Sequence, residues 1–290
     1  MIIFGFSFNK LLKLHTFEII LPLCGKCFSK IIIIHKSHIM IKKFIAVFVI
    51  LFSVASCNSS NDGFSNGSSD YNHTRAVGAS SNDLLSNNRY SALQIEILYM
   101  PGYAPDTQAV EHLKSFLSST LRKDGGITLR QREISATSSG SLSVEEIRQI
   151  ENNNRSIFTT GNTMAVSVIY TNGQYSGGAN TLGIAYRNTS VALMGKTIRD
   201  NSGGFGQVSR AKLESTVLEH EIGHLLGLVD LGSKMQVNHK DGANGNHCDN
   251  KNCLMYYASE TTDILGFINS GNVPQLDDNC KADLRANGGR

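Results

Sequence analysis

One helix-forming segment, residues 209–227, constrains the fold of this chain more than any other part of the sequence. Its apolar residues recur at helical spacing and include Val217, Leu218, Ile222, Leu225 and Leu226. A helix with so wide an apolar surface belongs in the interior of a protein. The same helix carries His220, Glu221 and His224, and buried polar side chains need partners. The sequence therefore predicts a central helix that presents three polar groups to a shared ligand.

His220 and His224 are four residues apart, which places both imidazoles on one face of a helix. Zinc is commonly bound by such histidine nitrogens. Glu221 lies one step around the helix and can reach a water molecule held by the zinc. The metal lowers the pKa of that water, and the carboxylate accepts its proton and passes it to a leaving amine. The alternative, a helix with three unconnected polar side chains, conflicts with the apolar surroundings.

A catalytic zinc has three protein ligands and an open position for water, so a third ligand is needed. The segment from His220 to Gly227 reads His-Glu-x-x-His-x-x-Gly and resembles the metzincin clan of metallopeptidases. In the commonest metzincins a third histidine follows three residues after that glycine, where this chain has Asp230. Gly227 permits the turn that bends the chain back towards the metal. The candidate third ligands are His239, His247 and Asp230.

A second resemblance favours His247 among these three. The sequence Cys253–Tyr257 resembles the metzincin turn in which a methionine, here Met255, packs beneath the metal. In matrix metallopeptidases and archaemetzincins the third histidine lies eight residues before that methionine, and His247 has this spacing. The run from His247 to Met255 also resembles archaemetzincins in its two cysteines. The resemblance implies that His247 is the third ligand and that residues 228–246 are an insertion, with the other two candidates as alternatives.

Tyr257 lies two residues after Met255. In astacins and serralysins a tyrosine at this position approaches the metal and stabilises the tetrahedral intermediate. The resemblance implies a catalytic role for Tyr257, although Tyr256 matches the turn of matrix metallopeptidases equally well. The alternative for both residues is a packed aromatic side chain whose hydroxyl group is hydrogen-bonded.

Three cysteines, Cys248, Cys253 and Cys280, follow the histidine segment. In an exported protein they favour one disulfide, either between Cys248 and Cys253 or between one of these and Cys280, with one thiol left over. Archaemetzincins instead use two cysteines beside the third histidine and a later Cys-x-x-Cys to hold a structural zinc. Here Asp277 stands at the first position of the later pair. The resemblance therefore implies a second zinc held by the three cysteines and Asp277.

The N-terminal region predicts export and anchoring to a bacterial membrane, on its periplasmic face or at the cell surface. Residues 40–56 combine two lysines, an apolar stretch and a small-residue cleavage zone, as in a signal peptide. Cys57 follows Val-Ala-Ser, which resembles a bacterial lipobox and implies a lipid anchor on that cysteine. Met40 is then the initiator, and residues 1–39 are translated upstream sequence. The alternatives are an ordinary secretory signal and a second membrane-associated stretch in residues 1–39.

Residues 57–88 are rich in Ser, Asn, Gly and Asp, which predicts a flexible tether.

In residues 89–290 strands are interleaved with helices. This pattern and the resemblance predict a single α/β (α+β) catalytic domain of metzincin type, with a mixed twisted sheet, the active-site helix and a small irregular C-terminal subdomain that ends in a helix. The expected strands are Ala92–Met100, Ile127–Ile134, Met164–Thr171, Thr181–Tyr186 and Ser190–Met194. The expected helices are Gln108–Leu121, Ser143–Asn153, Ser209–Leu226 and one opened by Pro274.

Composition narrows the functional classes. Apolar residues make up 41% of the chain and the net charge is only +3, so a sizeable core is expected and nucleic-acid binding is not. The helix motif, the resemblance and the N-terminal signal together lead us to expect a membrane-anchored zinc endopeptidase. We expect it to cut a peptide or protein that pairs with an edge strand at Thr181–Tyr186. One alternative is a catalytically silent lipoprotein that binds a polymer or protein on the same scaffold, which the intact Glu221 disfavours. Another is an aminopeptidase of restricted specificity.

Overall fold

The structure, a computed structural model, describes residues 14–23, 27–36, 71–268 and 272–290. The chain divides into two compact units, Met1–Asp62 and Gly63–Arg290. In the first unit, β1 (Leu14–Leu23) and β2 (Cys27–Lys36) pair as an antiparallel hairpin. The predicted signal peptide and Cys57 lie outside the described residues, so export and lipid anchoring stay predictions. No helix among the described residues is long and apolar enough to cross a membrane.

The second unit is built on a five-stranded sheet with the strand order β4-β3-β6-β9-β8. The parallel strands are β3 (Ala92–Tyr99), β4 (Ile127–Glu133), β6 (Thr163–Tyr170) and β9 (Ser190–Leu193). The last strand, β8 (Gly183–Arg187), runs antiparallel to β9 and forms one edge of the sheet. The predicted mixed sheet is confirmed, and so is the edge position expected for the segment that contains β8.

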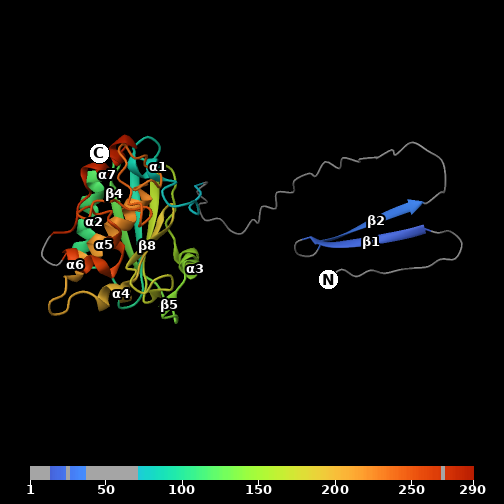
Figure 1. The fold of residues 1–290 in the computed structure, drawn as a ribbon, viewed down its shortest axis with the longest axis horizontal. Coiled ribbons are helices and arrows are strands. Elements are labelled where there is room, and N and C mark those ends of the chain that lie inside the picture. The colour runs from blue at the N-terminus through green and yellow to red at the C-terminus, as the bar shows by residue number, and fades with distance from the viewer. Residues whose placement is uncertain (1–13, 24–26, 37–70, 269–271) are drawn as a thin grey trace. The chain divides into compact units, whose positions relative to one another are not determined.

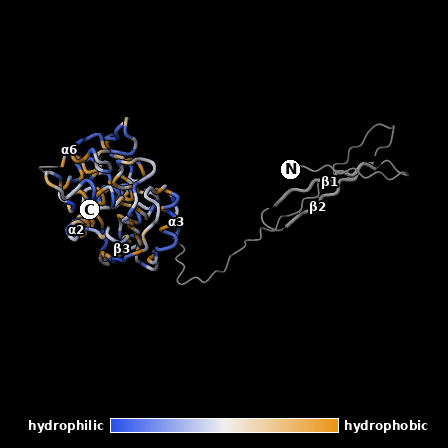
Figure 2. Tube along the Cα trace, turned by 90° about the horizontal axis from the view of Figure 1, so that it is seen from below, coloured by the Kyte–Doolittle hydropathy of each residue, from blue (hydrophilic) through white to orange (hydrophobic). Residues whose placement is uncertain are grey.

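Helices cover both faces of this sheet (Figure 1). On one face, α2 (Thr107–Thr120) and α5 (Arg210–Leu225) pack against each other and share the larger hydrophobic core with the sheet. On the other face, α3 (Val144–Asn154) is largely hydrophilic (Figure 2) and buries Ile147 in a smaller core. Side chains alternate between the faces along each strand. Every residue of α5 from Leu213 to Leu225 is buried, so this helix lies in the interior, as its sequence predicts.

Short elements complete the folded unit. They are α1 (Ser81–Leu85), α4 (Gly195–Asp200), α6 (Leu265–Ile268), α7 (Asp278–Ala286), the 3-10 turns η1 (Tyr257–Glu260) and η2 (Thr262–Ile264), and the paired strands β5 (Ser141–Leu142) and β7 (Gln174–Tyr175). The predicted C-terminal helix is present as α7, but it does not open at Pro274. It begins after Asp277, whose side chain caps it by accepting a hydrogen bond from the Cys280 N–H at 2.9 Å.

Residues 71–88 belong to the folded unit, so the prediction of a flexible tether is wrong for this segment. Leu84 and Leu85 of α1 are buried in the larger core. His73 is also buried, and its Nε2 accepts a hydrogen bond from the Thr159 N–H at 3.2 Å. The polar composition of the segment suggested a tether, but its polar side chains bind partners that are far away in the sequence. Such contacts cannot be predicted from composition.

The environment of His73 predicts a loss of stability in acid. Burial, followed by the charges of Arg155 and Arg75, lowers the pKa of His73 from 6.5 to about 3. Below about pH 6.5 the unfolded chain takes up a proton at this ring, whereas the folded chain does so only near pH 3. The free energy of unfolding therefore falls as the pH drops through this window, by at most about 1.4 kcal/mol per pH unit. Chemical denaturation of the wild type and of His73→Gln across the window measures this contribution, and equal pH slopes would contradict it.

Candidate metal centre and active site

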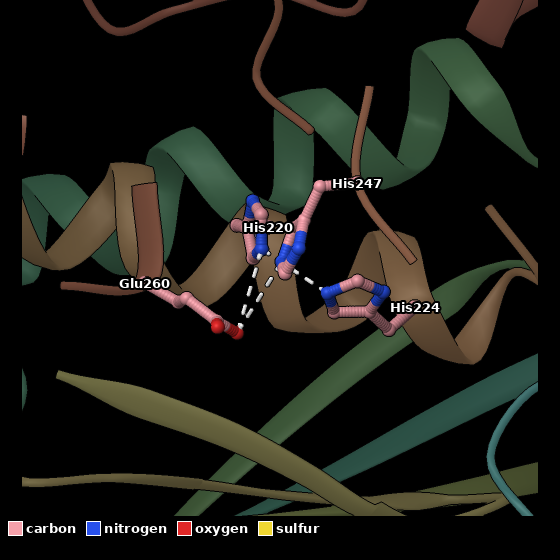
Figure 3. Close-up of side chains that lie close together, drawn as sticks. All are labelled: His220, His224, His247 and Glu260. Atoms are coloured by element: carbon pink, nitrogen blue, oxygen red, sulfur yellow. Dashed lines mark hydrogen bonds and ion pairs between the residues drawn. The ribbon is translucent and has the colours of Figure 1, made fainter. Parts of the chain in front are cut away.

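Three histidine side chains converge beside the C-terminal half of α5 (Figure 3). His220 and His224 come from α5 itself, and His247 comes from the long loop that precedes Met255. The Nε2 atoms of His220 and His224 are 3.1 Å apart. The ring centroid of His247 lies 5.3 Å from that of His220 and 5.2 Å from that of His224. The structure thus brings together the three residues that the sequence predicted as ligands.

Each of these rings is oriented by a backbone carbonyl group. In all three, Nδ1 donates a hydrogen bond to a carbonyl oxygen: His220 to Leu254 at 2.8 Å, His224 to Leu228 at 3.3 Å and His247 to Asn244 at 2.6 Å. Because a carbonyl oxygen can only accept, the proton of each neutral ring lies on Nδ1 and the lone pair lies on Nε2. Three Nε2 lone pairs therefore face a common point.

The charge state and the spacing of the rings suit a metal ion. Burial lowers the pKa of His220 to about 4 and that of His224 to about 3, so both rings are neutral at pH 7. The buried Nε2 of His247 has no hydrogen-bond partner. A tetrahedral zinc ion at about 2.0–2.1 Å from each nitrogen needs nitrogens roughly 3.4 Å apart. The residues present therefore fit a zinc ion.

Glu221 is fully buried between α5 and the edge strand β8. A Cβ atom on Gly183 of β8 would lie 2.7 Å from Glu221 Oε1, so glycine at this position leaves room for the carboxylate. Neither oxygen of Glu221 makes a hydrogen bond of normal geometry. Burial, and next the charge of Glu260, raises the pKa of Glu221 well above its ordinary value, and the backbone N–H of Ala185 in β8 opposes this shift only in part. A buried carboxylate without a close hydrogen-bond partner, beside converging imidazoles, has the setting of a proton-transfer group.

Glu260, at the end of η1, is a site residue that the sequence did not reveal. Its Oε2 lies 3.8 Å from His220 Nε2 and 3.6 Å from His247 Nε2. The carboxylate and the three histidines offer ligand atoms that all lie within 4.8 Å of one another. None of the motif spacings includes a carboxylate five residues after Met255, so only the folding of the turn brings Glu260 to the site.

The two alternative third ligands lie away from the three histidines. The chain turns sharply after Gly227, which has a φ of +85°, and Asp230 lies on this turn with 54% of its side chain exposed. Asp230 pairs with Lys240 at 3.1 Å. His239 is buried among the cysteines instead, and its Nε2 lies 2.8 Å from Asp283 Oδ2.

Met255 is fully buried against α5 at the turn that separates the two helical histidines. A Cβ atom on Gly223 would lie 2.4 Å from Met255 Sδ, so the methionine sulfur fills the space beside this glycine. Met255 thus packs against the helix that carries His220 and His224, and its predicted place beneath a metal stays a prediction. Tyr257 begins η1, and its ring packs against Tyr256 with 4.6 Å between the centroids. The catalytic role predicted for Tyr257 stays a prediction.

Comparison with known families decides the class of this protein. Residues 104–267 match the model of Metallo-peptidase family M12. This segment is more than half of the 290 residues, and it includes the three converging histidines, Glu221 and Glu260. The chain belongs to metallopeptidase family M12. The metallopeptidase predicted from the helix with His220 and His224 is therefore confirmed.

Solved structures similar to this M12 peptidase include two metallopeptidases. The archaemetzincin from Methanopyrus kandleri is 16% identical, with 69% of this chain and 97% of that chain covered and a TM-score of 0.45. Metalloproteinase-II from Bacteroides fragilis is 14% identical, with a TM-score of 0.38. It covers 69% of this chain, which in turn spans 54% of that protein. A comparison with curated proteins gives no match.

The M12 peptidase has a second cluster of metal-binding side chains. Cys248, Cys253 and Cys280 are buried and free, so none of the disulfides that the sequence allows is formed in the structure. His239, Asp277 and two of the cysteines, Cys248 and Cys280, offer ligand atoms within 4.8 Å of one another. Cys253 joins them, with its Sγ 3.6 Å from Cys280 Sγ. Five potential ligands thus gather apart from the three histidines.

The close contact between Gly223 and Met255 predicts a penalty for any side chain at this glycine. In Gly223→Ala the added Cβ displaces the buried sulfur, and overpacking of this kind costs about 1–3 kcal/mol. Better helix propensity offsets roughly 1 kcal/mol of this cost. Gly266→Ala is a matched control, because a Cβ there meets nothing within 4 Å. Thermal unfolding and metal retention are the measurements, and a Gly223→Ala protein as stable as the control would refute this packing.

Proposed function

We propose that this M12 protein is a zinc-dependent peptidase whose metal is held by His220, His224 and His247. The observation that supports it is the convergence of three Nε2 lone pairs, each fixed by a backbone hydrogen bond, beside the buried carboxylate of Glu221. A zinc ion bound there would lower the pKa of a water molecule and polarise the carbonyl group of the scissile peptide bond.

Glu221 carries out the proton transfers. Its ionised carboxylate accepts a proton from the attacking water, and the resulting carboxylic acid donates that proton to the nitrogen of the leaving amine. Burial stabilises the protonated form of Glu221, and the positive charge of a neighbouring cation stabilises the ionised form. The group can therefore both accept and release a proton during the reaction.

The edge strand β8 supplies the surface for the substrate. It pairs with β9 on one side only, and Glu221 packs against it at Gly183. An extended peptide that pairs with the free side of β8 would be held by main-chain hydrogen bonds along the histidine site. Such pairing makes no use of a free amino terminus. We therefore propose an endopeptidase rather than an aminopeptidase.

The state of Glu221 also favours an enzyme over a silent binding scaffold. A buried carboxylate without a close hydrogen-bond partner destabilises the fold, and binding alone would give it no role.

The location of the enzyme is proposed from sequence alone. The signal-like residues 40–56, followed by Cys57, support an exported protein that is anchored to a membrane by lipid on this cysteine.

Glu221→Gln is expected to abolish most of the peptidase activity and to leave metal binding intact. The amide cannot accept a proton, so kcat/KM should fall by about 10²- to 10⁴-fold. Glu219→Gln is the control, because Glu219 is a buried carboxyl group on the same helix that faces His112 rather than the histidine site. Hydrolysis of an internally quenched peptide with blocked ends, together with zinc content, tests this. Equal activity of Glu221→Gln and the wild type would disprove the proposed mechanism.

We also propose that the cysteine cluster holds a structural zinc through Cys248, Cys253, Cys280 and His239. Zinc bound at about 2.3 Å to sulfur and about 2.0 Å to nitrogen needs sulfurs roughly 3.7 Å apart and a nitrogen roughly 3.5 Å from each sulfur. The Cys253 and Cys280 sulfurs are 3.6 Å apart. His239 Nδ1 lies 3.4 Å from Cys248 Sγ and 4.0 Å from Cys280 Sγ. These distances fit one tetrahedral ion.

His239 suits this role better than Asp277, the ligand expected from the sequence. Asp283 Oδ2 accepts a hydrogen bond from His239 Nε2 at 2.8 Å, which leaves the Nδ1 lone pair directed at the sulfurs. Asp277 is already engaged, since its Oδ1 caps α7 at the Cys280 N–H. Its Oδ2 accepts hydrogen bonds from the side chain of Asn250 at 3.1 Å and from the Cys248 thiol at 3.3 Å. The carboxylate of Asp277 therefore supports the cluster through the helix cap.

Zinc content per chain separates these assignments. The wild type is expected to bind two zinc ions, and His247→Ala is expected to lose one of them together with all activity. His239→Ala should lose the other ion and unfold at a lower temperature. Asp277→Asn is the control, because Asn keeps the helix cap without a carboxylate, and it should retain both ions. Loss of zinc from Asp277→Asn but not from His239→Ala would show that the fourth ligand is the carboxylate.

A further inference from the structure

Glu260 places a second carboxylate at the histidine site, and the mechanism above does not use it. In Figure 3 its carboxylate points at the imidazoles from the η1 turn. The distances from Glu260 Oε2 to His247 Nε2 and His220 Nε2 are 3.6 and 3.8 Å. Both exceed the length of a hydrogen bond, which is about 2.7–3.2 Å. They are closer to the separation of two ligands on one tetrahedral zinc, roughly 3.4 Å.

We propose that Glu260 is a fourth protein ligand that closes the metal site until a substrate displaces it. This inference rests on the proposed zinc site. A catalytic zinc keeps one position open for water, whereas a zinc with four protein ligands is closed. Three histidine nitrogens and the Glu260 carboxylate form a set of four, with all ligand atoms within 4.8 Å of one another. In this arrangement the carboxylate occupies the position that hydrolysis requires.

The surroundings of Glu260 allow its carboxylate to leave. The side chain of Glu260 is 29% exposed, whereas that of His220 is fully buried. The carboxylate can therefore turn towards solvent without losing its hydration, and the histidines remain in place. The site thus has three fixed ligands and one that can exchange with water.

The backbone of Glu260 connects this ligand to the substrate strand. The Leu182 N–H, directly before β8, donates a hydrogen bond to the Glu260 carbonyl oxygen at 2.7 Å. Thr181 and Thr261 form a β-bridge beside it. A peptide that pairs with β8 would lie next to this anchored segment and compete with the carboxylate for the same space. Substrate binding and the opening of the metal site are therefore a single event.

The test compares Glu260→Gln and Glu260→Ala with the wild type and with Asp263→Asn. Glutamine keeps the shape but ligates weakly, and Asp263 is a carboxylate in the neighbouring turn η2 that has no contact with the histidines among the described interactions. Zinc affinity is measured by chelator competition. The visible spectrum of the cobalt-substituted protein reports the coordination of the metal. Subtracting the wild-type spectrum from that of each variant removes the contribution of cobalt bound at the cysteine cluster, which the variants leave unchanged. The kcat/KM is measured on the quenched peptide.

Both Glu260 variants are expected to bind zinc at the histidine site about 10- to 100-fold more weakly, to change the cobalt spectrum and to raise kcat/KM. Asp263→Asn should match the wild type. An unchanged zinc affinity and spectrum would overturn the inference, as would weaker zinc binding with lower activity. Lower activity that is confined to substrates with Lys or Arg after the cleaved bond would instead assign Glu260 to substrate binding, and would also overturn it. Failure of the zinc site itself is recognised separately, because His247→Ala would then keep its full zinc content.

Discussion

The active site depends on three backbone carbonyl groups more than on any side-chain contact. Each accepts the Nδ1–H of one histidine and thereby turns an Nε2 lone pair towards the same point. The carbonyls come from three separate places, namely the turn after α5 at Leu228, the segment just before Met255 at Leu254 and the long loop at Asn244. The metal-binding geometry therefore exists only when all three segments have folded. A substitution in any of these three segments can therefore alter the site even when His220, His224 and His247 are unchanged.

Two glycines fix the position of α5 between these segments. On one side, the absence of a side chain at Gly183 admits the Glu221 carboxylate beneath the edge strand. On the other side, the absence of a side chain at Gly223 admits the sulfur of Met255. The helix is therefore held closely on both faces, and Glu221 and the two helical histidines keep a constant relation to the edge strand β8.

The sequence predicted the parts of the site that follow from local patterns. Helical periodicity predicted α5 and its histidines, and the resemblance to archaemetzincins in the spacing to Met255 favoured His247 over the alternatives. Patterns along the chain could not predict contacts that arise when distant segments fold together. Glu260 reaches the histidines only through the η1 turn, and His239 joins the cysteines only through a loop of irregular structure. The order of residues 71–88 was missed for the same reason, since polar contacts to distant segments hold them.

The histidine site and the cysteine cluster are connected directly, because His247 and Cys248 are consecutive residues. These consecutive residues place their side chains in different clusters, so the backbone between them cannot shift without disturbing both. The Cys248 N–H also donates a hydrogen bond to the Met255 carbonyl oxygen at 2.8 Å, which ties the same residue to the segment around Met255. The long loop has little regular structure, and the free-energy cost of closing a loop grows only slowly with its length. The long stretch of residues 228–246 can therefore be accommodated, because the cysteine cluster beyond its end holds His247 next to α5.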